Sequence, residues 1–326
     1  MKLSRRELLA ALAGATCLGA WPARAGEPYP SKAVKLIVAF APGTGSDALA
    51  RIVANAMQPL LGQPVVVDNR SGAGGALGTE QGVRSPADGY TLTLVTTSTL
   101  LTTPVLNPNV HYRADRDIAA VAGLARSPFV IVVADKPGAP RTLAELKAQL
   151  GKSSGSFGSA GVGTITHLTS ELFLKRAGVK AVHVPYRGSA AALSDVAGGQ
   201  LLFGCDTLVA ALPLIRGTRL RALAVTSSER LSTLPDVPTV AEALLPGFHV
   251  SAWWGIAAPA GTPTDVVQRV SQATQQALNS LEVKTQLAAQ LLEPMPLNAA
   301  AFDALIRAEL PGWTEFVRET GIRIDS

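Results

Sequence analysis

The stretch APGTGSD, residues 41–47, joins a predicted buried strand over 34–40 to a predicted amphipathic helix over 47–61. Its two glycines let backbone N–H groups come close to a ligand, and its hydroxyl groups add further donors. The N-terminus of a helix also carries a partial positive charge, which favours a bound anion. The stretch therefore predicts an anion-binding loop, although Ser46 or Asp47 could serve only as the helix N-cap.

A second glycine-rich loop, GSFGSAGVGT over 155–164, again leads from a predicted strand into a predicted helix. It offers Ser159, Thr164 and a second set of helix N-terminal N–H groups. His167 lies on the first turn of that helix, where it could contact a ligand or act as a base. A lone histidine in such a place can also be a hydrogen-bonded structural residue, so both interpretations stay open.

Strand and helix patterns alternate along almost the whole chain, which favours an α/β fold with mostly parallel sheets. Further strands are predicted over 64–68, 90–97, 119–124, 129–134, 156–158, 181–184, 201–205, 221–225 and 253–257. Further helices are predicted over 142–150, 164–177, 189–197, 265–279 and 299–320.

Two segments, 125–129 and 226–238, have the character of crossings between two lobes. If the chain crosses twice, one lobe comprises 26–126 and 228–326, and the other comprises 127–227. Open α/β sheets bind ligands at the carboxyl ends of their strands. The sequence therefore predicts a binding cleft between the lobes, with both glycine-rich loops facing it.

Residues 1–25 have the features of an export signal. Arg5 and Arg6 precede an apolar run over 8–20, and the sequence Ala-Arg-Ala at 23–25 is typical of a cleavage site. The arginine pair fits the twin-arginine route, although the general secretory route accepts similar peptides. The run is shorter than the roughly 18 to 20 apolar residues that a membrane span requires. We expect cleavage after Ala25 and an exported mature chain.

The composition excludes several classes of protein. Without residues 1–25 the chain has 25 basic and 23 acidic residues and no basic stripe, so nucleic acid and anionic membranes are not expected partners. Cys205 is then the only cysteine, which excludes an intramolecular disulfide. The four histidines lack metal-binding spacing, and no nucleophile lies beside a base, so we expect neither a metal site nor an enzyme.

One enzymatic alternative remains at this stage. Gly43, Gly45 and Ala48 form a G-x-G-x-x-A pattern, and Asp68 follows about 20 residues later, as in dinucleotide-binding folds. The pattern would suit an exported NAD(P)-dependent oxidoreductase. The stretch GKSSG at 151–155 matches a hydrolase motif, but a helix precedes it and a strand follows, which is the wrong order.

The order of motifs resembles the substrate-binding proteins of tripartite tricarboxylate transporters, often called Bug receptors, over essentially all of 26–326. The resemblance rests on YPSK at 29–32, the loop up to Asp47, VDNR at 67–70, GAGG at 72–75, ADGYTL at 87–92, 158–167, VPYRG at 184–188, GGQ at 198–200, LRALAVT at 220–226, LPDVPT at 234–239 and APAGTP at 258–263.

This resemblance implies a periplasmic receptor with a type II, Venus-flytrap fold and no cofactor. Such a receptor captures a small carboxylate, such as a di- or tricarboxylate, an aromatic acid or an acidic amino acid, and delivers it to a permease with one small and one large membrane subunit. We expect a monomer. Carried over by position, the ligand-binding residues would be Gly43, Thr44, Ser46, Asp47, Ser98, Thr99, Ser159, Gly161, Thr164, His167, Tyr186 and Asp206.

A third possibility is an exported sensor component that binds the same ligand and signals to a membrane kinase. The sequence does not name the carboxylate. If the two loops hold it, replacing both Ser46 and Thr164 by alanine should weaken binding by at least about 2 kcal/mol, because two hydrogen bonds to a charged group would be lost.

Overall fold

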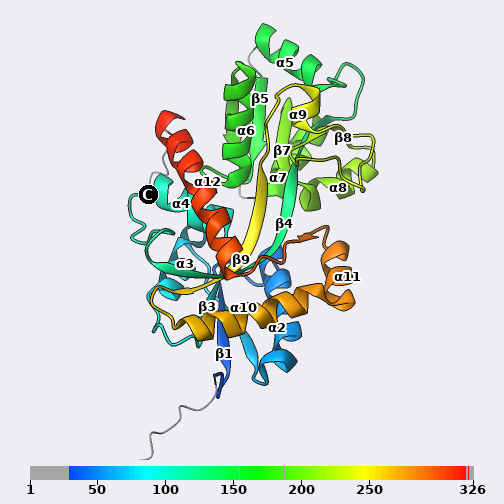
Figure 1. The fold of residues 1–326 in the computed structure, drawn as a ribbon. Coiled ribbons are helices and arrows are strands. Elements are labelled where there is room, and N and C mark those ends of the chain that lie inside the picture. Colours follow the sequence, from blue (N-terminus) through cyan, green and yellow to red (C-terminus); the bar gives the residue numbers. More distant parts are fainter. Residues whose placement is uncertain (1–28, 154, 187, 321, 323–326) are drawn as a thin grey trace, which may run out of the picture.

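The computed structural model describes residues 29–153, 155–186, 188–320 and 322 (Figure 1). The chain forms two lobes, one above the other in Figure 1, and the long strand β4 (Ile118–Ala134) extends from one lobe into the other. The expectation of a two-lobed α/β protein is therefore confirmed. The predicted signal peptide, 1–25, lies outside the described residues.

The sheet of the lower lobe has a parallel centre. Strand β1 (Val34–Val38) lies between β2 (Val65–Asn69) and β3 (Thr91–Thr96), and all three run in the same direction. Strand β9 (Ser251–Pro259) is antiparallel to β3 and to the first part of β4, whose other edge pairs with β10 (Glu293–Pro294). The continuous apolar run of β1 suits a strand that is covered on both faces.

The sheet of the upper lobe repeats this plan. Strand β5 (Gly155–Ser159) lies between β6 (Ala181–Pro185) and β7 (Phe203–Thr207), again with all three parallel. The second part of β4 lies between β7 and β8 (Leu220–Val225), and it is antiparallel to both. The expected parallel pairing thus holds in the centre of each lobe, while the strands next to the crossing add antiparallel pairs.

One detail of the prediction is wrong: residues 119–124 and 129–134 do not form two strands separated by a crossing loop. They belong to β4, which is unbroken because residues 125–128 continue the ladder with β9. Within that segment Arg126 pairs with Trp253 and Ser127 pairs with Ala252. The chain therefore passes between the lobes inside a sheet, where each residue keeps a backbone partner on β9.

Helices cover the sheets on both faces (Figure 1). They are α2 (Gly45–Leu61), α3 (Ala76–Val83), α4 (Thr103–Leu106), α5 (Leu143–Lys152), α6 (Ile165–Ala177), α7 (Ser189–Gly198), α8 (Leu208–Arg216), α9 (Val240–Ala243), α10 (Thr264–Asn279), α11 (Leu281–Ala289) and α12 (Ala299–Thr320), with a 3₁₀ turn η2 (Ala73–Gly75) and a π turn η3 (Ser98–Thr102).

Two packing contacts define the lower lobe. Helix α2 buries the side chains of Leu49, Val53 and Met57 in a core shared with α10. Helix α12 places Phe302 directly against Gly255 of β9, where a Cβ atom would lie 2.1 Å from the ring. A larger residue at position 255 would therefore displace α12 from the sheet.

Candidate functional site

The carboxyl ends of the parallel strands in the two lobes face each other. In the lower lobe, the end of β3 at Thr96 lies level with Trp254 of β9, which in turn pairs with Ala125 of β4. In the upper lobe, the end of β7 at Thr207 pairs with Phe129 of β4. Ala125 and Phe129 are four positions apart on β4, which corresponds to about 13 Å of extended strand between the two strand edges. Ligands of open α/β sheets bind at such edges.

The loop before α2 is held by its own hydrogen bonds. The Gly43 N–H donates to Oδ2 of Asp47 at 2.9 Å, and Gly43 has the positive φ of 82° that favours glycine. The Thr44 hydroxyl donates to the Ala41 carbonyl at 2.9 Å and accepts a bond from the Asp47 N–H at 3.4 Å. Thr44 is therefore the N-cap of α2.

The loop before α6 repeats these bonds. The Gly163 N–H donates to Nδ1 of His167 at 3.1 Å, and Gly163 has a φ of 74°. The Thr164 hydroxyl donates to the Gly161 carbonyl at 2.7 Å and accepts from the His167 N–H at 3.4 Å. The pentapeptides GTGSD, 43–47, and GTITH, 163–167, are thus equivalent. Their common pattern was visible in the sequence, but sequence reasoning missed it.

Each of these helices begins with two N–H groups that are available to a ligand. The N–H groups of Gly45 and Ser46 in α2, and of Ile165 and Thr166 in α6, donate to no other described residue. Unpaired N–H groups and the partial positive charge of a helix N-terminus together suit an anion. The sequence predicted N–H donors at both helix starts, but the predicted set of ligand-binding residues includes Ser46 and omits Gly45, Ile165 and Thr166.

Asp47 is a supporting residue of its loop. It is 4% exposed, and its carboxylate accepts bonds from Gly43, Arg51 and Asn69. The hydrogen bond from Arg51 is the main cause that holds the pKa of Asp47 below its usual value. The carboxylate is therefore ionised, and its bonds to these three partners fix the shape of the loop.

His167 and Ser159 likewise support the second loop. The ring of His167 is buried and stacks on His183 with centroids 3.8 Å apart. The Ser159 hydroxyl lies 2.7 Å from Nε2 of His183 and accepts a bond from the Gly161 N–H at 3.1 Å. Burial, aided by the neighbouring His167, lowers the pKa of His183 to about 4. Gly161 has a φ of 138°, which explains a glycine at that position.

Ser98 and Thr99 follow the end of β3 and differ in their surroundings. Thr99 is fully buried, and its hydroxyl accepts a bond from the Thr96 N–H at 3.0 Å. Its carbonyl accepts the hydroxyl of Tyr112 at 2.6 Å. The Ser98 side chain is half-buried and makes no hydrogen bond to the described residues. Of the two, Ser98 is therefore the one with a free hydroxyl.

Tyr186 and Asp206 lie at the carboxyl ends of β6 and β7. The Tyr186 hydroxyl donates to Asp195 of α7, and this bond raises the pKa of Tyr186. Asp206 is 2% exposed, and its Oδ1 accepts bonds from the Ser189 hydroxyl at 2.8 Å and the Thr207 N–H at 2.7 Å. Burial raises the pKa of Asp206 to about 6.

Sequence reasoning gave no indication of Trp254. Its indole N–H donates to the Ser46 hydroxyl oxygen at 2.9 Å, although the two residues are 208 positions apart. Trp254 is half-buried at the level where β9 passes the end of β3. No local pattern could have linked the two residues, because their contact depends on how β9 pairs in the sheet.

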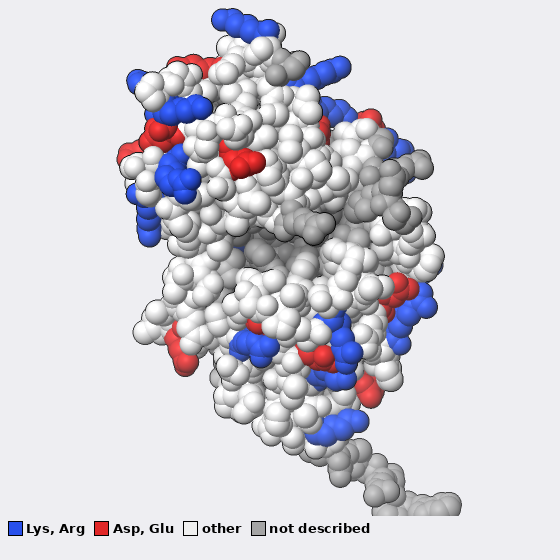
Figure 2. All heavy atoms as spheres, turned by 180° about the vertical axis from the view of Figure 1, so that it is seen from behind, with Lys and Arg blue, Asp and Glu red and all other residues white. Residues whose placement is uncertain are grey.

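The face seen in Figure 2 is hollowed across its middle, between the two lobes. Side chains without charge border most of this hollow, while Lys, Arg, Asp and Glu gather above and below it. The described side chains that border it would therefore offer a ligand mainly neutral donors. The two sets of helix N–H groups, on the facing strand edges, supply such donors.

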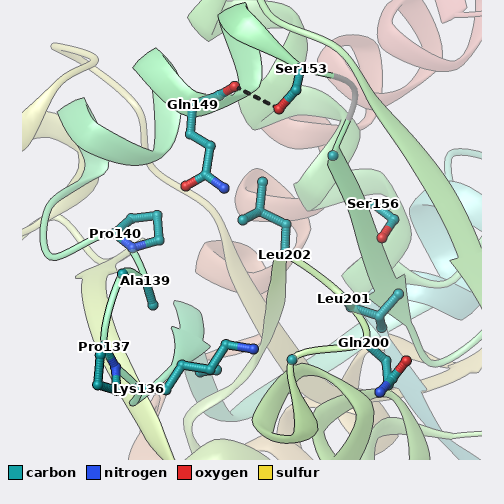
Figure 3. Close-up of a pocket in the computed structure, with 14 residues that line it drawn as sticks. Lys136, Pro137, Ala139, Pro140, Gln149, Ser153, Ser156, Gln200, Leu201 and Leu202 are labelled. Atoms are coloured by element: carbon teal, nitrogen blue, oxygen red, sulfur yellow. Dashed lines mark hydrogen bonds between the residues drawn. The ribbon is translucent and has the colours of Figure 1, made fainter.

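A pocket of about 400 Å³ lies at the far end of the upper lobe (Figure 3). It is lined in part by Lys136, Gln149, Ser156 and Gln200, around the amino ends of β5 and β7. This end is opposite to the edge at which open α/β sheets bind ligands. We therefore place the candidate site at the facing carboxyl edges instead.

Two kinds of feature are absent from the described residues. No group of three or more His, Cys, Asp or Glu side chains in this part of the chain is arranged to hold a metal ion. No helix there combines the length and the apolar character that crossing a membrane requires. Cys205 is buried as a free thiol, and burial raises its pKa.

Comparison with known proteins identifies the family. The profile of the tripartite tricarboxylate transporter family receptor matches residues 49–322. BugT of Bordetella pertussis (strain Tohama I) is 36% identical over 302 residues, which cover 91% of this chain and 92% of BugT.

Two solved structures have the same fold as this chain. Rpa4515 of R. palustris with adipate has a TM-score of 0.79 and 32% identity to this chain. The match covers 90% of this chain and 99% of the Rpa4515 chain. MatC (Rpa3494) from Rhodopseudomonas palustris with bound malate has a TM-score of 0.76 and 31% identity to this chain. The match covers 89% of this chain and 100% of the MatC chain.

These likenesses extend over nearly the whole chain, and they agree with the fold and with the resemblance of the motifs. Members of this family are substrate-binding receptors and not enzymes, which removes the support for a dinucleotide-dependent oxidoreductase. The chain belongs to the tripartite tricarboxylate transporter receptors, the family of the Bug proteins.

Proposed function

We propose that this receptor binds a small carboxylate between its lobes in the periplasm and delivers it to the small and large membrane subunits of a tripartite tricarboxylate-type transporter. The main support is the pair of equivalent helix N-termini on facing strand edges, each with two available N–H groups. The adipate and malate in the structures of two relatives support the same class of ligand.

The proposal divides the roles within the two loops. The N–H groups of Gly45, Ser46, Ile165 and Thr166 would contact the carboxylate, together with the Ser46 hydroxyl. The remaining residues of the predicted set within these loops would hold the loops in shape, because their polar atoms already have partners. These residues are Gly43, Thr44, Asp47, Ser159, Gly161, Thr164 and His167. Ser98, Tyr186 and Asp206 would line the remainder of the site, and Thr99 would support it from within.

Neutral donors are sufficient for the affinity of such a receptor. Three or four hydrogen bonds to a charged group, at about 1.5 to 3 kcal/mol each, give roughly 5 to 12 kcal/mol before the cost of ordering the ligand. A micromolar Kd corresponds to about 8 kcal/mol. The two helix N-termini each add about half an elementary positive charge, so no arginine or metal ion is required.

The proposal also includes the lobes and the export of the chain. The lower lobe would comprise 26–126 and 228–326, and the upper lobe 127–227. The pairing of β4 supports this division, because β4 pairs with β9 up to Pro128 and with β7 from Phe129 onward. Export would follow cleavage after Ala25. Ligand binding would favour a closed arrangement in which both edges contact the carboxylate.

The first experiment is a thermal-shift screen of the mature chain, 26–326, after unfolding and refolding to remove any bound ligand. The panel contains mono-, di- and tricarboxylates, aromatic acids, amino acids, NAD and NADP. A ligand at 100 times its Kd adds about 2.7 kcal/mol, which raises Tm by several degrees. We expect a shift with a carboxylate. A shift only with a dinucleotide would contradict the proposal and restore the oxidoreductase.

The role in transport requires a second experiment. Deleting the gene for this chain should abolish cellular uptake of the ligand that the screen identifies, and the wild-type gene should restore uptake. Uptake that continues without the receptor would contradict delivery to a transporter and favour a sensor component instead.

A further inference from the structure

We propose that Trp254 is a positioning residue of the binding site, because its indole N–H directs the Ser46 hydroxyl toward the ligand. This inference rests on the proposed binding of a carboxylate at the start of α2. It adds a residue that lies far from the loop in the sequence, on β9, the strand that pairs with β4 through the crossing between the lobes.

Two adjacent tryptophans on β9 point to opposite faces of the sheet. The Trp254 indole N–H donates to the Ser46 hydroxyl oxygen on α2, whereas the Trp253 indole N–H donates to Glu309 on α12, in both cases at 2.9 Å. Consecutive side chains of a strand alternate in this way. Trp253 is fully buried and Trp254 is half-buried, so only Trp254 lies on the side of the candidate loop.

The bond from Trp254 limits what the Ser46 hydroxyl can do. A serine hydroxyl has one proton to donate and two lone pairs that accept. Because Trp254 occupies an acceptor position, the proton must point elsewhere, and no described residue accepts it. The Ser46 N–H and the Gly45 N–H on the same helix turn are also available. The hydroxyl therefore becomes a third donor at this helix N-terminus.

The equivalent residue of the upper lobe, Thr166, resembles Ser46 only on the acceptor side of its hydroxyl group. The Thr166 hydroxyl oxygen accepts a bond from the Ala160 N–H at 3.1 Å. There the donor is part of the loop itself, while in the lower lobe it comes from a distant strand. The Thr166 hydroxyl also lies 2.9 Å from Oγ1 of Thr164, whose own proton goes to the Gly161 carbonyl. Thr166 therefore donates to Thr164, and of the two hydroxyls only that of Ser46 keeps a proton for a ligand.

The test compares the variants Trp254→Phe and Trp253→Phe, which each remove one indole N–H and keep an aromatic ring. Calorimetry measures the Kd for the carboxylate that the thermal screen selects. We expect Trp254→Phe to raise Kd about tenfold, as suits a misdirected hydrogen bond to a charged group. Trp253→Phe, the matched control, should leave Kd within about twofold.

A double-mutant cycle separates positioning from general support of the fold. Ser46→Ala should also raise Kd about tenfold, and the double variant Ser46→Ala/Trp254→Phe should be no weaker than either single variant. If Trp254 only supported the structure, the double variant would bind about a hundredfold more weakly. Such additivity, or an unchanged Kd in Trp254→Phe, would overturn the proposal while leaving carboxylate binding intact.

Fluorescence supplies a measurement that does not depend on weakened binding. In a mature chain that carries Trp253→Phe and Trp313→Phe, Trp254 is the remaining indole. Titration with the carboxylate should shift its emission, because the neighbouring hydroxyl then contacts an anion. An unchanged emission at saturation would overturn the proposal. If no carboxylate binds the wild type at all, the proposed function fails, and this inference fails with it.

Discussion

Asp206 is an unusual residue for the interior of this protein, because it keeps an ionisable group almost fully buried. Its Oδ1 accepts bonds from Ser189 and Thr207, and burial raises its pKa from 3.8 to about 6. Above pH 6 the buried carboxylate is charged, so it lowers stability relative to the unfolded chain. Functional sites often retain groups that lower stability in this way.

Asp206→Asn is therefore expected to stabilise the protein at pH 7.5. The amide oxygen can accept the same bonds, while the buried charge is lost. The pKa shift corresponds to about 3 kcal/mol at most, and we expect a gain of about 1 to 3 kcal/mol in urea unfolding. The folded wild type takes up a proton as pH falls through 6, so the gain should vanish near pH 4.

A matched control for this measurement is Asp135→Asn, which removes the same charge from an exposed position paired with Arg221. Surface pairs contribute little, so this variant should not be more stable than the wild type. A loss of stability in Asp206→Asn at pH 7.5 would show that the ionised carboxylate makes bonds that an amide cannot replace.

The element that organises the candidate site is the helix N-terminus with its threonine cap. Thr44 and Thr164 cap α2 and α6 through the same two bonds, and Thr142 caps α5 through a bond from the Glu145 N–H. A cap contributes about 1 kcal/mol to stability. Because α5 starts far from the facing edges, removing its cap should lower stability without affecting ligand binding.

Thr164→Ala and Thr142→Ala should each lower the free energy of unfolding by about 1 kcal/mol. Only Thr164→Ala should also weaken carboxylate binding, because it loosens the loop that presents the Ile165 and Thr166 N–H groups. Urea unfolding and calorimetry on the same samples measure both effects. Equal binding by the two variants would contradict a role for the α6 N-terminus.

Local patterns were sufficient to predict the central strands and most of the long helices, because their burial repeats along the sequence. They failed for α8, whose sequence is almost continuously apolar and contains Pro213, and for β4, whose continuity depends on its pairing with β9. The loops of the site could be predicted from their glycines. The contact between Trp254 and Ser46 could not, because only the folded sheet brings these residues together.

At the scale of the whole molecule, the two lobes are joined by few elements. Strand β4 belongs to both sheets, and α12 packs on β9 through Phe302 while its last turns contact α6 through the pair Lys175 and Glu319. A ligand that contacts both strand edges would favour arrangements in which the edges approach each other.

Small-angle X-ray scattering should therefore give a smaller radius of gyration for the mature chain when the carboxylate is present at saturation. The variant Ser46→Ala, at a ligand concentration that leaves it mostly unbound, should keep the value of the free wild type. A radius unchanged by saturating ligand would show that binding does not bring the lobes together.

Because β4 is continuous, the number of residues in the crossing between the lobes decides which face of the sheet each later side chain occupies. Phe129, Ile131 and Val133 contribute to one hydrophobic core, while Val130 and Val132 contribute to another on the opposite face. Because side chains alternate along a strand, inserting a single residue between Ala125 and Phe129 would exchange these two sets. Inserting two residues would restore the faces and only lengthen the link. A change of two residues in this link would therefore keep both cores, whereas a single inserted residue would have to be absorbed as a bulge, such as the one β4 already has between Gly123 and Ala125.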